Sequence, residues 1–211
     1  MRRIVDLTLT IENGNLAYEV NPKCFFNQYQ TIENDGYNLT QIILNSHAST
    51  HMDAPYHFVE DGMKLDEIPL DRLIGPAVVI NCTHRKDREM IMLEDIKSSF
   101  GKIEKDKIVL IRTDWYKHYP SKHFNYDMPN IDIPLIEFLV ERKIKLLGLE
   151  TPSLNWADNP GAHRKLLGAG IILVEALGYL DQLTRDEVEF FAIPLKLKGL
   201  DGCPIRAFAI E

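Results

Sequence analysis

Residues 42–58 read IILNSHASTHMDAPYHF, and this stretch holds three of the seven histidines in the chain. It opens with three apolar residues at 42–44, which indicate the end of a strand. Ala54 precedes a proline, and this position disfavours helical backbone angles. We therefore predict that residues 45–58 form an irregular loop at a strand end, the kind of segment that often carries binding and catalytic groups.

The side chains of this segment have the chemistry of a metal site. Imidazole and carboxylate groups are the common ligands of catalytic zinc or manganese. His47, His51 and Asp53 could therefore hold one ion, and the two oxygens of the carboxylate could also bridge to a second ion. His57 follows Asp53 by four residues and could stay unligated, as a base near neutral pH.

A polar surface loop is the simpler alternative, because a single histidine is more often a surface or core residue than a ligand. Three histidines and an aspartate within residues 47–57 favour the metal site instead. A structural zinc site is a further alternative. Such sites are usually closed and rich in cysteine, whereas nitrogen and oxygen donors suit an open catalytic site.

The composition narrows the class of protein. The chain has 211 residues, enough for one domain with a substantial core, and 45% of them are hydrophobic. The net charge of −7 argues against a nucleic-acid partner, because phosphate binding needs a basic surface. No apolar run approaches the roughly 20 residues that span a bilayer, so we expect no membrane partner. Polar residues at 6, 8 and 10 argue against a signal peptide, and we expect a cytoplasmic protein.

The remaining cysteines and histidines give no second site. The three cysteines are far apart and form no C-x-x-C pair, so they indicate neither a disulfide framework nor a cysteine zinc site. We expect them to be small buried hydrophobic residues. These cysteines are Cys24, Cys82 and Cys203. Three histidines lack ligand-like neighbours and are expected on the solvated surface: His84, His118 and His123.

Short apolar runs rich in β-branched residues predict strands at 42–44, 77–82, 108–112, 144–149, 171–174 and 204–210. The spacing of apolar residues predicts a helix at 93–100. A second helix is predicted at 133–143, with Asp132 as its N-cap and Pro134 in its first turn. A third is predicted at 159–167, with Gly168 as its stop. With no repeat and no linker, residues 1–211 indicate a single α/β domain, a mixed sheet with flanking helices, whose strand order the pattern does not give.

The segment 47–57 resembles the cyclase-type metal-dependent hydrolase family, which includes bacterial kynurenine formamidase (arylformamidase). The family pattern H-x-G-T-H-x-D-x-P-x-H is matched at every position except its glycine, where Ser49 stands. Residues 163–171, HRKLLGAGI, followed by Glu175, resemble the family's H-R-x-L-L-x-x-G-I and its ligand glutamate. Residues 148–153 resemble its G-x-D-T-P-S, and residues 201–206 its D-G-x-P-x-R.

The resemblance implies roles for individual residues. Five would be metal ligands: His47, His51, Asp53, His163 and Glu175. Asp53 would bridge two ions, and His57 would be the general acid/base. From the local sequence alone, His163 would instead be a surface helix residue and Glu175 a solvated strand end.

The resemblance also implies a fold and cofactors. The expected fold is the swivelling β/β/α arrangement of the family, assembled as a homodimer or homotetramer. Zinc is the expected metal, with two ions per subunit, and manganese is the alternative. The sequence departs from the family at Glu150, where aspartate is expected, and at Asn155, where an acidic residue is common. We expect these changes to affect substrate recognition, and we expect an unstrained backbone at Ser49.

The implied reaction is hydrolysis of N-formylkynurenine, a small-molecule substrate, to kynurenine and formate. Hydrolysis of another small cyclic amide, ester or lactone, such as isatin, is the alternative. A third possibility is a metal-binding protein without catalysis. His57 argues against it, because metal binding does not need an unligated histidine. The H-E-x-x-H and G-x-S-x-G motifs of zinc peptidases and serine hydrolases are absent. Candidates for stacking on an aromatic substrate, for each of which core packing is the simpler role, are Phe25, Phe26, Tyr29, Trp115 and Trp156.

Overall fold

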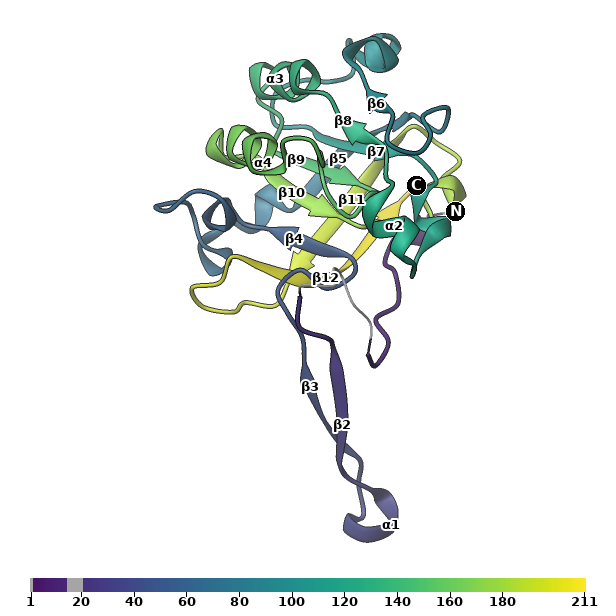
Figure 1. Ribbon diagram of the computed structural model, residues 1–211, viewed down its shortest axis with the longest axis vertical. Coiled ribbons are helices and arrows are strands. Elements are labelled where there is room, and N and C mark those ends of the chain that lie inside the picture. The colour runs from purple at the N-terminus through teal and green to yellow at the C-terminus, as the bar shows by residue number, and fades with distance from the viewer. Residues whose placement is uncertain (1, 15–20) are drawn as a thin grey trace.

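An eight-stranded mixed sheet organises the computed structural model, which describes residues 2–14 and 21–211 (Figure 1). Its strands are β1 (Ile4–Asp6), β4 (His51–Asp53), β5 (Ile74–Asn81), β7 (Ile108–Arg112), β9 (Leu146–Leu149), β10 (Ile172–Glu175), β11 (Glu187–Pro194) and β12 (Gly202–Ile210). They follow the order β1-β12-β11-β5-β7-β9-β10-β4, and β12 also pairs with β4. This last pairing closes seven strands into a barrel.

The barrel combines a parallel and an antiparallel half. Strands β5, β7, β9 and β10 run parallel, whereas β11, β12, β1 and β4 pair antiparallel with their neighbours. The long β12 pairs with β4 through residues 202–204 and with β1 through residues 208–210. One strand therefore closes the barrel and also anchors the N-terminal segment.

Close approach at the closure requires a glycine in β12. A Cβ built on Gly202 would lie 2.7 Å from the carbonyl oxygen of Met52 and 2.8 Å from Cε1 of His47. These distances are shorter than Cβ contacts allow, so any larger residue would push β12 away from β4. The closure of the barrel and the position of His47 therefore both require a glycine at residue 202.

Both faces of the parallel strands are buried, which explains their nearly continuous apolar sequence. Ile108, Leu110 and Phe190 belong to a core cluster on one face of the sheet. Val109 and Ile111 belong to a second cluster, on the face that the helices cover. The principal helices are α3 (Ile133–Glu141) and α4 (Asn159–Gly168). Smaller elements are α2 (Lys122–Tyr126), β6 (Met90–Ile91), β8 (Asn130–Ile131), and the 3₁₀ turns η1 (Pro55–His57), η2 (Leu65–Glu67), η3 (Leu70–Arg72), η4 (Leu93–Ser99), η5 (Trp115–His118) and η6 (Leu180–Gln182).

The mixed α/β fold and most predicted elements are confirmed. The strand predictions at 77–82, 108–112, 144–149, 171–174 and 204–210 correspond to β5, β7, β9, β10 and β12, and the helices at 133–143 and 159–167 to α3 and α4. Three local predictions are wrong. Residues 93–99 form the 3₁₀ helix η4, residues 51–53 form the strand β4, and Gly168 is the last residue of α4, whereas the helix was expected to end just before it. The left-handed residue after that helix is Gly170, with φ +79°.

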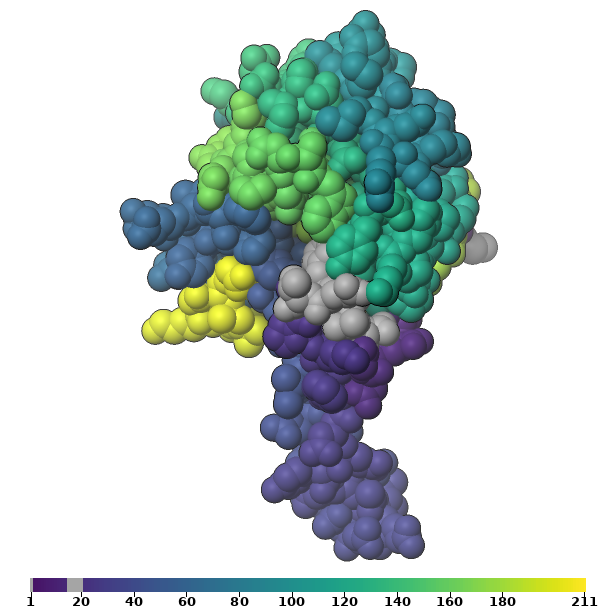
Figure 2. All heavy atoms as spheres, viewed as in Figure 1, coloured from purple at the N-terminus to yellow at the C-terminus, as the bar shows by residue number. Residues whose placement is uncertain are grey.

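The predicted strand at 42–44 belongs to a separate hairpin. β2 (Phe25–Gln30) and β3 (Leu39–Ile43) pair only with each other among the described strands, and α1 (Ile32–Asp35) lies at their tip. Residues 25–43, here called the arm, project away from the barrel (Figures 1 and 2). Every residue of β3 is exposed, although the segment reads as apolar. Among the described residues, no helix is long and apolar enough to cross a membrane.

Candidate metal centre

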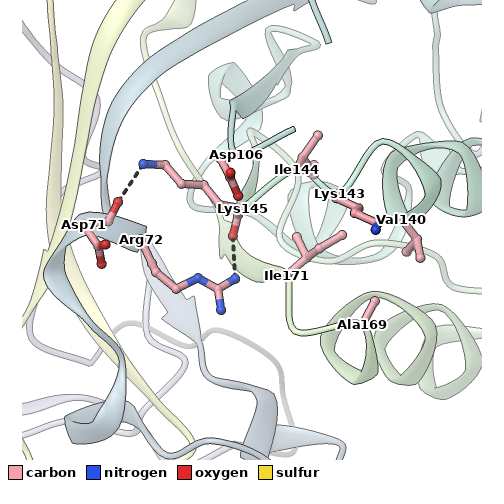
Figure 3. A pocket seen from close by; sticks show the side chains of 9 residues that line it. All are labelled: Asp71, Arg72, Asp106, Val140, Lys143, Ile144, Lys145, Ala169 and Ile171. Carbon is pink, nitrogen blue, oxygen red and sulfur yellow. Dashed lines mark hydrogen bonds between the residues drawn. The ribbon is translucent and has the colours of Figure 1, made fainter. Parts of the chain in front are cut away.

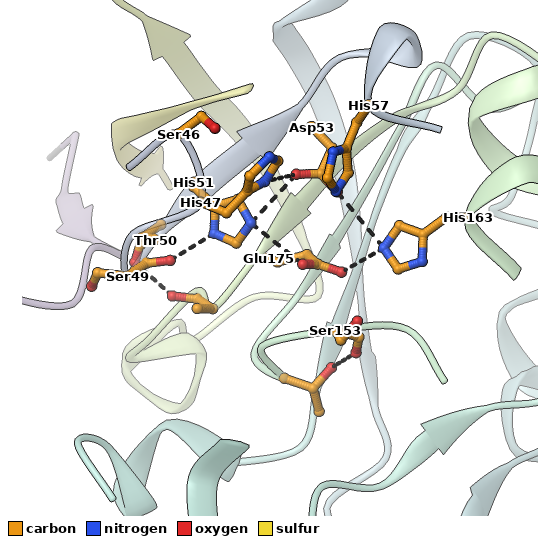
Figure 4. A network of polar contacts seen from close by, with 12 residues as sticks. Ser46, His47, Ser49, Thr50, His51, Asp53, His57, Ser153, His163 and Glu175 are labelled. Atoms are coloured by element: carbon orange, nitrogen blue, oxygen red, sulfur yellow. Dashed lines mark hydrogen bonds and ion pairs between the residues drawn. The ribbon is translucent and has the colours of Figure 1, made fainter. Parts of the chain in front are cut away.

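All six residues singled out from the sequence lie together where β4, β10 and α4 meet (Figure 4). They are His47, His51, Asp53, His57, His163 and Glu175. The pairing of β4 with β10 places His51 directly opposite Glu175. His51 and Asp53 are two residues apart on one strand, so their side chains share a face, and Met52 between them points into the core. His163 lies on α4, and its side chain reaches the same face.

Asp53 is the centre of the cluster. Its Oδ1 lies 2.8 Å from Nδ1 of His47 and 3.4 Å from Nε2 of His51. Its Oδ2 lies 3.7 Å from Nε2 of His163 and has no hydrogen-bond partner, although it is buried. Glu175 completes the cluster from β10, with oxygens 3.4 Å from Nε2 of His51 and 3.3 Å from Nε2 of His163.

The backbone orients two of the histidines. Nδ1 of His51 donates to the carbonyl of Ser49 at 2.8 Å, and Nδ1 of His163 donates to the carbonyl of Asn159 at 2.8 Å. Each contact fixes the tautomer of its ring and turns Nε2 toward the two carboxylates. Metal-ligating histidines are usually held in this way by a second hydrogen bond.

His47 and His57 lie at the more exposed edge of the cluster. Their rings are 3.9 Å apart between centroids, and 16% and 26% of their side chains are exposed. Asp201 serves both of them, with its Oδ2 2.8 Å from Nε2 of His47 and 3.4 Å from Nδ1 of His57. The sequence marked 201–206 as a motif without a role for Asp201. Asp201 lies beside the site because of the conformation of the loop before β12. The sequence pattern alone does not predict that conformation.

The carboxylates control the protonation of these groups. Burial acts against charging His47 and His51, but Asp53 and its neighbouring carboxylates raise the pKa of His47 to about 9 and of His51 to about 10. Burial likewise opposes ionisation of Asp53, yet His47 and His51 hold its pKa well below the usual range. Burial also acts against charging His163, but Glu175 raises its pKa.

The donor set fits a divalent cation. Two histidines present Nε2 to two buried carboxylates, and one carboxylate oxygen is left without a hydrogen bond. Buried polar atoms in proteins almost always have a partner, so an orphaned oxygen among histidines is the position expected for an ion. Two groups of potential ligand atoms each lie within 4.8 Å of one another: His47, Asp53 and His57, and His51, Asp53 and Glu175. Imidazole and carboxylate donors suit zinc or manganese.

Comparison with known proteins identifies the family. The cyclase family model, described as "Putative cyclase", matches residues 5–155. Kynurenine formamidase from Bacillus cereus is 30% identical over 182 residues, which make up 83% of this chain and 81% of that protein. The chain belongs to the cyclase family. The family expected from the histidine motif is thereby confirmed.

Solved structures of similar proteins have the same fold over the whole chain. Isatin hydrolase A from Labrenzia aggregata, bound to benzyl benzoate, has a TM-score of 0.89 and 31% identity, covering 99% of this chain and 93% of that chain. A predicted metal-dependent hydrolase from Bacillus stearothermophilus has a TM-score of 0.83 and 26% identity, covering 100% and 98%. The fold shared with these structures therefore includes both the barrel and the histidine segment.

Two departures from the cyclase-family pattern are buried in the interior of the protein. Glu150 is fully buried, and its carboxylate accepts hydrogen bonds from the backbone N–H groups of Thr113, Asp114 and Leu180. Burial raises its pKa to about 7. Asn155 is also buried and accepts from the backbone of Ala157. Both side chains hold loops at the ends of strands, and their effect on substrate recognition stays a prediction.

The third departure, Ser49, adopts a strained backbone. Its φ is +57°, in the left-handed region where the cyclase-family pattern has glycine, so the expectation of an unstrained backbone is wrong. Its hydroxyl donates to the carbonyl of Leu9 at 3.1 Å. The next residue, Thr50, is buried, donates to the carbonyl of Ala176 and accepts from the N–H of Leu9. Ser49 and Thr50 therefore tie the histidine segment to the N-terminal segment and to the end of β10.

The remaining candidates divide between surface and core. Cys24, Cys82 and Cys203 are buried, as predicted. His84 and His118 are exposed, as predicted, and His84 pairs with Asp95. His123 is half-buried, and the rings of His118 and His123 both contact the buried Trp115. Of the aromatic candidates, only Trp115 is a core residue. Phe25, Tyr29 and Trp156 are exposed, so core packing is wrong for these three.

A pocket of about 850 Å³ lies away from this centre, at the amino-terminal ends of the parallel strands (Figure 3). Two of its cations already have partners. Nζ of Lys145 donates to the carbonyls of Asp71 and Ile74 at 2.6 Å, and Arg72 donates to the carbonyls of Lys145 and Gly170. These contacts join η3 to the starts of β9 and β10. In parallel α/β sheets and barrels, ligands usually bind at the carboxyl ends of the strands, which is where Glu175 lies.

Ser49→Gly and Ser49→Ala separate the strain from the hydrogen bond. The glycine variant relieves the left-handed backbone and loses the bond to Leu9, so we expect a free energy of unfolding within about 1 kcal/mol of the wild type. The alanine variant keeps the strain and loses the bond, so we expect it to be about 1 kcal/mol less stable. Urea denaturation measures both. A glycine variant less stable than the alanine variant would contradict the strain argument.

The raised pKa values predict that metal uptake releases protons. His47 and His51 have pKa values of about 9 and 10, so both are protonated at pH 7 in the metal-free protein. Their charge stabilises the metal-free fold at neutral pH, and this contribution is lost as the pH rises through 9 to 10. A metal ion requires neutral imidazoles, so its affinity should increase from pH 7 to pH 9. Calorimetric titration with zinc in buffers of different ionisation enthalpy should show more than one proton released, and zero release would refute the assignment.

Proposed function

We propose that this protein is a metal-dependent amidohydrolase of the kynurenine formamidase type. One observation carries the proposal: the six residues that the family motifs mark meet in one buried cluster around the unpartnered Oδ2 of Asp53. A curated relative of similar length is named kynurenine formamidase, and a similar solved structure is described as a metal-dependent hydrolase. The proposed substrate is N-formylkynurenine, and the products are kynurenine and formate.

The ligand roles follow the family. His47, His51 and Asp53 would hold one ion, and Asp53, His163 and Glu175 would hold a second. Zinc is the proposed metal, two ions per subunit, with manganese as the alternative. A bound divalent ion supplies a Lewis acid for the substrate carbonyl and lowers the pKa of a water molecule.

His57 is proposed as the general acid/base. It lies at the open edge of the cluster, where a substrate can reach it, and Asp201 faces its Nδ1 at 3.4 Å. This contact orients the ring and leaves Nε2 as the atom that transfers the proton. Cleavage of an amide needs such a group, because the leaving nitrogen must receive a proton. Asp201 is thus a positioning residue for His57.

A second substrate class has specific support. Isatin hydrolase A is 31% identical and matches 99% of this chain, so a small cyclic amide, ester or lactone is the alternative substrate. A metal-binding protein without catalysis is the alternative of a different class. We further propose a single domain over residues 1–211, the swivelling β/β/α arrangement, a homo-oligomer and a cytoplasmic location, all as the family resemblance and composition imply.

The decisive experiment measures N-formylkynurenine hydrolysis by the purified protein, before and after chelation and after zinc or manganese is restored. We expect turnover that the chelator abolishes and the metal restores, because the ligand cluster carries the reaction. Isatin and a simple lactone are assayed in parallel. Turnover of isatin alone would move the assignment to the alternative substrate class, and no turnover of any of them by metal-loaded protein would contradict the amidohydrolase.

The His57→Ala variant tests whether His57 is a metal ligand or the general acid/base. We expect unchanged metal content and a loss of kcat of about 10²–10⁴-fold, the usual contribution of a general acid/base. His84→Ala, at an exposed histidine paired with Asp95, is the matched control and should retain full activity. Elemental analysis is needed beside the kinetics, because His47, Asp53 and His57 could also form one ligand group. Loss of metal in His57→Ala would make His57 a ligand.

A further inference from the structure

The loop that follows β9, residues 150–155, is buried throughout, although four of its six side chains are polar. It contains the TPS part of the motif at 148–153, which the ligand and acid/base assignments leave without a role. Buried polar groups in proteins almost always have hydrogen-bond partners. The partners of this loop include the two elements that carry His163 and Glu175, as the next contacts show.

The side chain of Ser153 leads to His163. Its hydroxyl donates to Oδ1 of Asn159 at 2.8 Å. Asn159 is the first residue of α4, and its backbone carbonyl accepts from Nδ1 of His163 at 2.8 Å. Two hydrogen bonds in series, both through residue 159, therefore join Ser153 to the imidazole. Figure 4 draws Ser153 in the same polar network as His163 and Glu175.

The backbone of the same loop leads to Glu175. Ala176, directly after this glutamate, has a φ of +53°, and its N–H donates to the carbonyl of Thr151 at 2.9 Å. A non-glycine residue keeps such a backbone only where its surroundings hold it. The hydroxyl of Thr151 donates in turn to the carbonyl of Ser153 at 2.8 Å. The turn at the end of β10 and the start of α4 are thus tied to one short segment.

Both ends of the loop are themselves fixed. Glu150 accepts three backbone hydrogen bonds from the segments that follow β7 and β10. Asn155 accepts from the N–H groups of Ala157 and Asp158, and Asp158 is the N-cap of α4. The start of α4 is therefore held at its cap by Asn155 and at its first residue by Ser153.

The other half of the ligand cluster has separate supports. Nδ1 of His51 donates to the carbonyl of Ser49, and the ring of His47 lies between Asp53 and Asp201. These contacts come from the histidine segment and from the loop before β12. A change at Ser153 should therefore affect His163 and leave His47 and His51 in place.

We propose that Ser153 is a positioning residue for the second metal ion. Acting through Asn159, its hydroxyl holds Nε2 of His163 at 3.3 Å from Glu175 and 3.7 Å from Asp53. The inference rests on the proposed function, because the second ion and its ligands are taken from it. Residues that hold a ligating histidine from behind typically contribute about 10–100-fold in metal affinity. Ser153 thus sets the affinity for one ion and has little effect on the other.

Calorimetric titration of the metal-free full chain with zinc tests this division. The wild type should bind two ions, and Ser153→Ala should weaken one binding step about tenfold or more while the other stays within about twofold. Ser121→Ala is the matched control, because its hydroxyl holds the start of α2 by accepting from the N–H of Phe124. This control should keep both affinities. Equal weakening of both steps in Ser153→Ala would contradict a role confined to the second ion.

A double-mutant cycle tests the path through Asn159. Asn159→Ala removes Oδ1 and keeps the backbone carbonyl that His163 uses, so it should weaken the same binding step as Ser153→Ala. The two changes together should cost no more than either alone, because they remove one shared contact. Asn159→Asp keeps an acceptor for the serine hydroxyl and should retain the wild-type affinities. Additive losses in the double variant would show that Ser153 does not act through Asn159.

Nuclear magnetic resonance of the metal-free protein separates this inference from the proposed function. The Nδ1–H proton of His163 should exchange with water about tenfold faster in Ser153→Ala than in the wild type, because the hydrogen-bonded path behind the ring opens more often. Ser121→Ala should leave the exchange rate unchanged. A wild type that binds only one zinc ion would overturn both the two-ion assignment and this role. Two ions bound alike by the wild type and Ser153→Ala, with unchanged exchange, would overturn the role of Ser153 alone.

Discussion

The structure depends on the pairing of one three-residue strand with two neighbours. β4 pairs with β10 on one side and with β12 on the other, and this closes the barrel. The first pairing puts Glu175 opposite His51, and the second puts Gly202 opposite Asp53. The same backbone hydrogen bonds therefore close the fold and bring the proposed metal ligands together. A register shift of one residue would turn His51 and Asp53 into the core and Met52 out of it.

Burial of the two carboxylates dictates the electrostatics of the site. A buried charge is costly unless it is paired, and Asp53 and Glu175 are paired only with histidines. In the metal-free protein the histidines supply the compensating charge, which is why the pKa of His51 is raised to about 10. Protons and metal ions are alternative ways of balancing the same carboxylates. The unpartnered Oδ2 of Asp53 favours the ion, because protonated histidines leave that oxygen without a hydrogen bond.

The sequence correctly predicted those helices and strands whose formation depends on local pattern and burial. The apolar run at 108–112 was predicted as a strand, and β7 has those bounds with four of its five residues buried. β11, with the sequence EVEFFAIP, was not predicted, although its burial alternates along the chain as expected of a half-buried strand. The histidine segment was predicted as a loop, but its pairing with strands more than a hundred residues away makes 51–53 a strand. Apolar residues at 42–44 correctly indicated a strand, yet their sequence does not say whether the same chain or another buries them.

The metal ligands do not determine the substrate. A relative named kynurenine formamidase and a structure of isatin hydrolase share this fold and differ in the compound their names give. In this chain four of the proposed ligands, His51, Asp53, His163 and Glu175, lie on strands and a helix, whereas His47 lies in the turn between β3 and β4. The segments that lead to the exposed edge of the site are the arm and residues 195–200. A change in those segments can reshape the approach to His57 without moving a ligand. In the proposed function the ligand cluster supplies the reaction, and the exposed segments beside it are where a difference in substrate would arise.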